Sequence, residues 1–192
     1  MEKFKHVIPS KKYEGKAIDY INEFYKYGSQ INGVGGLRKY LNDYDKWLQK
    51  LDDDKNRSLS EEHVPAETFF LVRTLDDKIV GMINIRLALN EKLKKFGGHI
   101  GYSIRPTERN KGYNKINLYL GLLFCQKHEI REVFMDCDKD NVASAKTIIA
   151  LGGKLVREYY DDENDHCIVQ DYIIDVSKAI KDNENIYKPF ID

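Results

Sequence analysis

One segment of the chain combines residue types that bind anions, and it runs from Ile100 to Ile116. A β-patterned run is followed there by a short basic turn and then by an amphipathic helix. A helix start leaves backbone N–H groups unpaired and carries a partial positive charge, while Arg109 and Lys111 add full charges. Gly112 lets the backbone approach a ligand without a Cβ in the way. The segment is therefore typical of a site for a pyrophosphate group.

The turn matches neither common nucleotide-binding fingerprint. A P-loop needs two glycines separated by four residues before Lys-Ser/Thr, and a dinucleotide fold needs three spaced glycines after a strand. The turn resembles motif A of the GNAT superfamily of acetyl-CoA-dependent N-acetyltransferases, whose core reads Arg/Gln-x-x-Gly-x-Gly/Ala. Here the motif runs from Arg109 to Asn114, and Asn114 departs from the pattern at the last position.

A second segment, from Asp136 to Gly153, resembles the strand, asparagine and helix that form the other half of the cofactor cleft in this family. The two segments follow each other in the order and spacing that the family shows. Residues 98–106 and 143–148 are most similar to a bacterial branch of predicted acetyltransferases. Two motifs in register are more specific than either one alone.

The resemblance implies that acetyl-CoA is the cosubstrate, without a metal, and that it binds between these two segments. The pyrophosphate should rest on the turn, the pantetheine arm should pair with the strand edge, and the second segment should form the opposite wall. The predicted cofactor-binding residues are Tyr102, Ile104, Arg109, Asn110, Lys111, Gly112, Tyr113, Asn114, Lys115, Asn141, Ser144 and Lys146. Asn141 is equally suited to cap its own helix.

Acetyl transfer requires a neutral amine, because an ammonium group with a pKa near ~10 has no lone pair. A general base is therefore expected beside the thioester, and His99 is the first candidate because its unperturbed pKa of ~6.5 suits the task. Tyr102 is the candidate proton donor to the leaving thiolate, although core packing also explains a tyrosine there. The tyrosine that commonly donates this proton in the family is replaced by Ile148. Alternatives for the base are Glu91, Glu108 and Asp136.

The composition of the 192-residue chain limits the classes of partner. It has 31 basic and 31 acidic residues and a pI near 7.0, so no overall field favours nucleic acid or an anionic membrane. Cys125, Cys137 and Cys167 lack CxxC spacing, which argues against a disulfide framework or a zinc site. No apolar signal segment or membrane span is apparent. We therefore expect a cytoplasmic protein with reduced thiols and with no membrane or nucleic-acid partner.

Apolar periodicity predicts the elements that position these residues. We expect strands at 3–8, 68–74, 78–86, 98–105, 132–137, 154–160 and 166–175. Helices are expected from Ser10 to Gly28, from Leu37 to Leu51, over 113–127 and after residue 141, with a loop at 52–64 and a solvated acidic hairpin at 161–165. The apolar face of the first helix should hold Ala17, Ile21, Phe24 and Tyr25. The tail from 176 to 192 should hold a short helix and a loose end.

No linker divides the chain, so residues 1–192 are expected to form one domain. The resemblance implies that these elements form an α/β (α+β) fold. It implies a mixed, mostly antiparallel twisted sheet of six to seven strands, with helices on both faces and a splayed central cleft.

The predicted function is acetyl-CoA-dependent transfer of an acetyl group, directly, to a primary amine of a small molecule or a peptide. The acceptor, the pathway and the oligomeric state stay open, with a homodimer among the alternatives. A CoA-binding regulatory module with little turnover is the rival function, and Asn114 and Ile148 motivate it. A third alternative is an interaction protein that uses its tyrosine-rich N-terminal helices.

Overall fold

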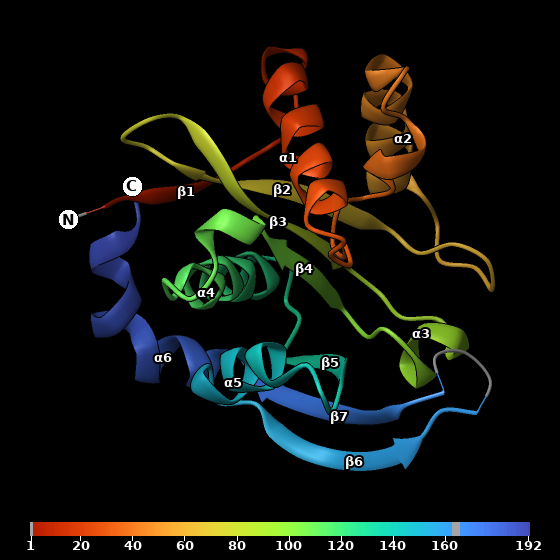
Figure 1. Cartoon of the computed structure of the whole chain (residues 1–192). Coiled ribbons are helices and arrows are strands. Elements are labelled where there is room, and N and C mark those ends of the chain that lie inside the picture. Colours follow the sequence, from red (N-terminus) through yellow and green to blue (C-terminus); the bar gives the residue numbers. More distant parts are fainter. Residues whose placement is uncertain (1, 163–165) are drawn as a thin grey trace.

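The computed structural model describes residues 2–162 and 166–192, and within them seven strands form two sheets (Figure 1). The first sheet has the order β1 (Phe4–Val7), β2 (Ala66–Arg73), β3 (Lys78–Arg86) and β4 (Ile100–Ile104). The second has the order β5 (Glu132–Asp138), β7 (Ile168–Asp175) and β6 (Lys154–Tyr160). All neighbouring strands within each sheet are antiparallel, which confirms the predicted α+β class.

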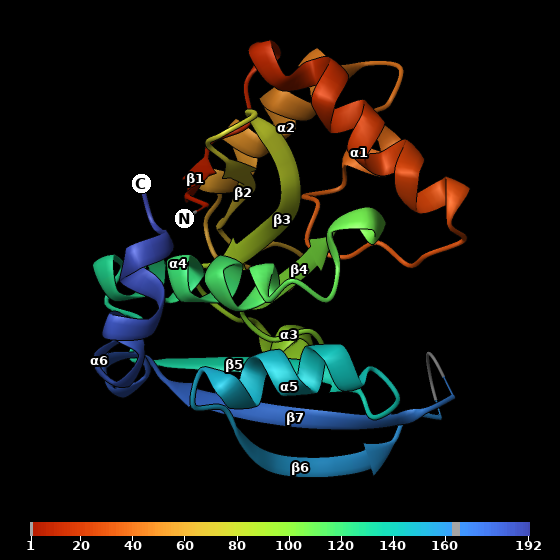
Figure 2. The ribbon, with the colours of Figure 1, turned by 60° about the vertical axis from the view of Figure 1, so that its left-hand side comes forward.

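Helices cover both faces of the first sheet. The α-helices of the described residues are α1 (Glu14–Lys26), α2 (Tyr44–Asn56), α3 (Glu91–Lys95), α4 (Tyr113–Lys127), α5 (Val142–Ala150) and α6 (Val176–Tyr187). Short 3-10 turns occur at Lys11–Tyr13, Leu37–Lys39, Pro106–Glu108 and Lys188–Phe190. Helices α1 and α2 lie on one face of the first sheet, and α4 lies between the other face and the layer of α5 and α6 (Figures 1 and 2).

The two faces of the first sheet bury separate apolar clusters, because side chains alternate along each strand. On one face, Phe70 and Met82 pack with α1 and α2 around Trp47. On the other, Leu71 and Ile83 pack with α4. This second cluster continues into the second sheet, so one apolar core joins the two sheets.

The two sheets meet where β4 and β5 run side by side, and this junction opens the central cleft. The His99 backbone N–H donates to the Phe134 carbonyl at 2.7 Å, just before β4 begins. Beyond that bond β4 diverges from β5 (Figure 2). Among the described residues β4 pairs only with β3, and β5 pairs only with β7. Gly98 has a φ of 51°, and a Cβ there would lie closer than 3.0 Å to the Phe134 carbonyl oxygen. The predicted splay therefore starts at a contact that only glycine allows.

The second predicted helix begins later than expected, at Tyr44 instead of Leu37. Gly36, with a φ of 82°, leads into a 3-10 turn that buries Leu37. Asp43 then caps α2 by accepting a backbone hydrogen bond at 3.2 Å. The helix also continues to Asn56, so the predicted loop was wrong for 52–56.

Smaller differences concern the termini and one exposed face. Tyr25 was expected on the apolar face of α1, but it is 53% exposed and Tyr20 is buried instead. Helix α3 was not predicted, and α6 is longer than the short helix expected in the tail. The predicted acidic hairpin lies partly outside the described residues, since 163–165 are not among them. No helix in the described ranges is long and apolar enough to cross a membrane.

Candidate active site

A cavity of about 650 Å³ opens between the end of β4 and the first turns of α4 and α5. All but one of the predicted cofactor-binding residues line it, namely Tyr102, Ile104, Arg109, Asn110, Gly112, Tyr113, Asn114, Lys115, Asn141, Ser144 and Lys146. The exception is Lys111, whose ammonium pairs with Glu108 at 2.8 Å instead. The fold therefore brings both predicted motifs to one cavity.

Two residues of the basic turn beside the cavity have a left-handed backbone conformation, which is unusual for L-residues. Asn110 has a φ of 63°, and Gly112, the N-cap of α4, has a φ of 80°. Asparagine tolerates this left-handed region better than most residues, and glycine adopts it freely. Such alternation around a helix start forms a nest of backbone N–H groups that suits an anion. A Cβ at Gly112 would meet nothing within 4 Å, so the space in front of the turn is open.

The first turn of α5 faces the same cavity. The Asn141 side chain caps this helix by accepting from the Ser144 N–H at 3.1 Å, so the capping alternative is correct. Asn141 also lines the cavity, and capping therefore leaves it beside any ligand. Figure 2 shows α4 above α5 with both helix starts on the side of the β4 tip. Two helix dipoles thus direct their positive ends to one place.

Tyr102 spans the cleft from β4 to α5. Its hydroxyl lies 2.9 Å from Ser144 Oγ, and burial raises the pKa of the phenol above its ordinary value. The Asn114 side chain lies close enough to this hydroxyl to oppose that rise in pKa. Asn114 Oδ1 is buried and has no hydrogen-bond partner among the described residues. The side chain that departs from the motif is thus turned toward Tyr102 and keeps a free acceptor.

Sequence reasoning missed one wall of the cavity, the segment after α1 that contains Gly28, Ser29, Gln30 and Asn32. Arg109 links it to the turn, because its Nη2 donates to Ser29 Oγ at 2.7 Å and its Nε donates to the Ile104 carbonyl at 3.2 Å. The guanidinium also lies over the Phe24 ring. No local motif identifies this wall, since the residues in contact lie 80 positions apart.

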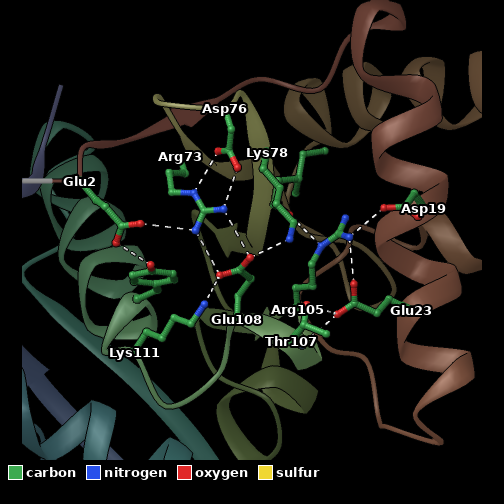
Figure 3. A network of polar contacts seen from close by, with 12 residues as sticks. Glu2, Asp19, Glu23, Arg73, Asp76, Lys78, Arg105, Thr107, Glu108 and Lys111 are labelled. Carbon is green, nitrogen blue, oxygen red and sulfur yellow. Dashed lines mark hydrogen bonds and ion pairs between the residues drawn. The ribbon is translucent and has the colours of Figure 1, made fainter.

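Ion pairs around Glu108 hold the turn in place (Figure 3). Glu108 is buried and accepts from Lys78 at 2.7 Å, from Lys111 at 2.8 Å and from Arg73 at 3.2 Å. Burial alone would raise the pKa of Glu108, but the ion pairs with Lys111, Lys78 and Arg73 lower it to about 2. Because the folded pKa lies below the ordinary one, this stabilisation is complete above pH 4.5 and is lost as the pH falls through about 2.

Helix α1 holds the same turn from its other side (Figure 3). Glu23 accepts from the Thr107 N–H at 2.9 Å and from the Thr107 hydroxyl at 2.8 Å. Arg105 Nη1 donates to Glu23 at 3.0 Å and to Asp19 at 2.8 Å. The turn is therefore fixed to two elements before any ligand binds.

We expect Glu108→Gln to lower the free energy of unfolding by about 3 kcal/mol, because it leaves three cations around a buried neutral amide. Urea unfolding of the purified protein measures the change. Glu184→Gln is the control, since its pair with Lys188 is exposed on both sides and should contribute less than about 0.5 kcal/mol. Equal losses in the two variants would show that the buried cluster does not stabilise the turn.

His99 lies outside the cavity, at the junction of β4 and β5. Its Nδ1 accepts from the Phe134 N–H at 3.0 Å, which assigns the proton to Nε2. Burial, with the Arg86 charge, lowers the pKa of His99 to about 4. The imidazole is therefore neutral near pH 7, and its lone pair is already used. This geometry favours a structural role for His99 over the predicted role of general base.

Comparison with known proteins gives one family and one fold. Residues 22–154 match the family model described as an acetyltransferase (GNAT) domain. No curated protein sequence matches the chain. The structure of Mycobacterium smegmatis RimJ in complex with CoA-disulfide has a TM-score of 0.68 at 11% identity, covering 94% of this chain and 89% of that chain.

Two other solved structures are similar over comparable lengths. The ribosomal-protein-S5-alanine acetyltransferase from Vibrio fischeri has a TM-score of 0.66 at 14% identity, covering 91% of this chain and 94% of its own. The microcin C7 self-immunity acetyltransferase MccE, in complex with acetyl-CoA and AMP, has a TM-score of 0.64 at 15% identity, with coverages of 89% and 91%. At these identities the likenesses show the fold.

Proposed function

This chain belongs to the GNAT acetyltransferase family and is an acetyl-CoA-dependent acetyltransferase, and we propose that it transfers the acetyl group directly to a primary amine of a small molecule or a peptide. The observation that carries the proposal is the meeting of two helix starts and the end of β4 at one cavity. Structurally similar proteins are named for acetylation of a ribosomal protein and of spermidine, so both kinds of amine are candidate acceptors.

The residues of the cavity fit the chemistry of coenzyme A. Backbone N–H groups from Asn110 to Asn114 suit the pyrophosphate, whereas that of Lys115 already donates to the Gly112 carbonyl, and the open space at Gly112 admits the ligand. The free acceptor of Asn114 Oδ1 suits an amide N–H of the pantetheine arm. The unpaired edge of β4 at Tyr102 and Ile104 can bind the arm as an added strand. Acetyl-CoA, when bound there, supplies an activated acetyl thioester.

Tyr102 is the group we assign as proton donor to the leaving thiolate. Its raised pKa keeps the hydroxyl protonated at neutral pH, and the hydrogen bond with Ser144 Oγ holds the hydroxyl oxygen in place. Ile148, which replaces the tyrosine that commonly donates this proton in the family, is fully buried in the core and does not line the cavity. We therefore assign to Tyr102 the proton donation that a tyrosine at the position of Ile148, on α5, commonly performs in the family.

We expect His99→Gln to keep the pH dependence of kcat/KM. A neutral imidazole whose lone pair is already bonded cannot accept the proton of the amine near pH 7. The amine itself, with a pKa near ~10, should set the profile, so kcat/KM should rise about tenfold per pH unit in both proteins. An inflection near the ordinary histidine pKa of ~6.5 in the wild type, lost in the variant, would restore His99 as the base.

The proposed function is tested by thiol release from acetyl-CoA with a panel of amines. The panel contains amino acids and their amides, phosphoethanolamine, spermidine and short peptides with free N-termini. Thiol release with at least one amine, and a product heavier by one acetyl group in mass spectrometry, is the expected result. Acetyl-CoA binding by calorimetry without transfer to any of them would favour the regulatory module instead.

A further inference from the structure

A second cavity, of about 340 Å³, lies on the opposite face of the first sheet from α4. Its walls are the glycine-containing segment 31–36, helix α2 and the residues that follow α2, and its floor includes Asn84 and Arg86 of β3. These two alternate along β3 with Ile83 and Ile85, which pack toward α4. Gly33 lies so close to the backbone of Gly101 that a Cβ on Gly33 would overlap it. The cavity is therefore adjacent to the strand that borders the cofactor cleft.

Asn32 connects the two cavities, because it lines both of them. Its carbonyl is held by Ser103 Oγ at 2.6 Å, while the residue as a whole is exposed. Among the residues that the structure describes, Asn32 is the one common to the two linings. The second cavity is therefore on the side from which an acceptor would reach a thioester bound on the α4 side.

The charges that line the second cavity are mainly positive. Four cationic side chains, Arg38, Lys50, Arg57 and Arg86, face two carboxylates, Asp54 and Glu62. Asp54 is already shared by two of the cations, Lys50 and Arg57, and the side chain of Glu62 is 87% exposed. Arg38 is exposed and has no ion pair with any residue that the structure describes. Arg86 is engaged elsewhere, because its Nη1 donates to the carbonyls of Gly97 and Gly98 at 2.7 Å and its charge interacts with Asp136. An anion entering this cavity would therefore meet the excess positive charge of Arg38 and of the two cations that share Asp54.

Arg57 has donors to spare. Its Nε lies 3.1 Å from Asp54 Oδ1, but the N–H bond is not aligned with that oxygen well enough to form a hydrogen bond. This buried nitrogen has no other hydrogen-bond partner among the described residues. A guanidinium carries five N–H donors in a planar fork that matches a carboxylate or a phosphate. The side chain of Arg57 is 32% exposed, so an oxyanion can reach its remaining N–H groups and bind them through charge-assisted hydrogen bonds.

We propose that the acceptor amine also carries an anionic group, a carboxylate or a phosphate, which binds Arg38 and Arg57 in the second cavity. The anion would anchor the acceptor on the α2 side while its amine extends past Asn32 to the cofactor cleft. This inference rests on the proposed function, because only an acetyltransferase has an acceptor amine. The binding of the anion itself is a separate property, which is measurable without turnover.

Binding is tested by NMR titration of the protein saturated with coenzyme A, so that the phosphate turn is already filled. The probes are leucine against leucinamide and phosphoethanolamine against ethanolamine, which differ within each pair by the anion. We expect only the anionic member of at least one pair to bind, and the pair that responds identifies carboxylate or phosphate. Arg57→Gln and Arg38→Gln should each weaken that binding about tenfold, the usual effect of losing a charge-assisted hydrogen bond.

Lys39→Gln is the matched control, because Lys39 is exposed on the same short turn as Arg38 but does not line the cavity. It should leave binding unchanged. Equal binding of the members with and without the anionic group in both pairs, absence of binding by all four probes, or equal effects of Lys39→Gln and Arg57→Gln would overturn the proposal.

Turnover separates this inference from the proposed function. If both are correct, the anionic amine should have the higher kcat/KM, and Arg57→Gln should abolish that preference without changing the affinity for acetyl-CoA. A preference for spermidine or leucinamide would overturn the anionic acceptor and leave the acetyltransferase function intact. Anion binding that depends on Arg57, without transfer to any amine, would instead contradict the proposed function alone.

Discussion

Gly112→Glu should lower the affinity for acetyl-CoA at least ~100-fold, because it places a carboxylate where the pyrophosphate is expected to bind. Two unit charges about 4 Å apart repel by about 4 kcal/mol at an effective dielectric constant of ~20, and half of that already reduces affinity more than tenfold. The added side chain also fills the open space in front of the turn. Calorimetry with acetyl-CoA on both proteins measures the loss.

Gly112→Asn is the control for this substitution. Both variants force an L-residue to a φ of 80°, which costs about 1–2 kcal/mol of folding free energy. The chain already accepts asparagine in this conformation at Asn110. The neutral variant should therefore fold and lose less than about tenfold in affinity, since it adds no charge. If the glutamate variant binds acetyl-CoA as tightly as the wild type, the phosphate site is not at this turn.

Gly98→Ala should be the most destabilising single methyl addition at the junction of the sheets, with a loss of at least about 3 kcal/mol. The alanine Cβ would overlap the Phe134 carbonyl, which is the atom that accepts the hydrogen bond from His99. Neither backbone can move without separating β4 from β5. Urea unfolding measures the change in stability, and acetyl-CoA affinity should fall with it as the cleft distorts.

Gly28→Ala is the control, because it introduces the same backbone strain without the steric overlap. Gly28 has a φ of 56°, close to the 51° of Gly98, but a Cβ there would meet nothing within 4 Å. Its cost should be the backbone strain alone, about 1–2 kcal/mol. Similar unfolding midpoints for the two variants would mean that β4 and β5 tolerate separation, and the cleft would then not depend on this junction.

The apolar periodicity of the sequence was sufficient to predict the bounds of an element where one of its faces is buried and its ends carry clear signals. The bounds of α4, β3 and β6 agree with those predicted from periodicity. The start of α2 was missed because the 3-10 turn at Leu37 buries an apolar residue at a spacing that continues the helical pattern. Tyr20 was the better choice for the face of α1, since it lies three residues after Ala17 and four before Phe24.

The cavity to which we assign the cofactor was largely predictable because each of its two motifs is continuous in sequence. Its remaining wall was not, since Ser29 reaches the turn only through the folded position of α1. The role of His99 also depends on tertiary structure. A histidine on a strand looks the same in sequence whether its ring faces a substrate or accepts the N–H of Phe134.

The pair of Lys111 and Glu108 affects how the coenzyme would be attracted. That ammonium group is committed to an internal carboxylate, so the turn relies more on fixed peptide dipoles than on this mobile cation. Dissolved ions screen exposed charges over a Debye length of about 8 Å at physiological ionic strength, and they act less on donors in direct contact with a ligand. Coenzyme capture by this turn should therefore tolerate salt better than capture by a cluster of free lysines.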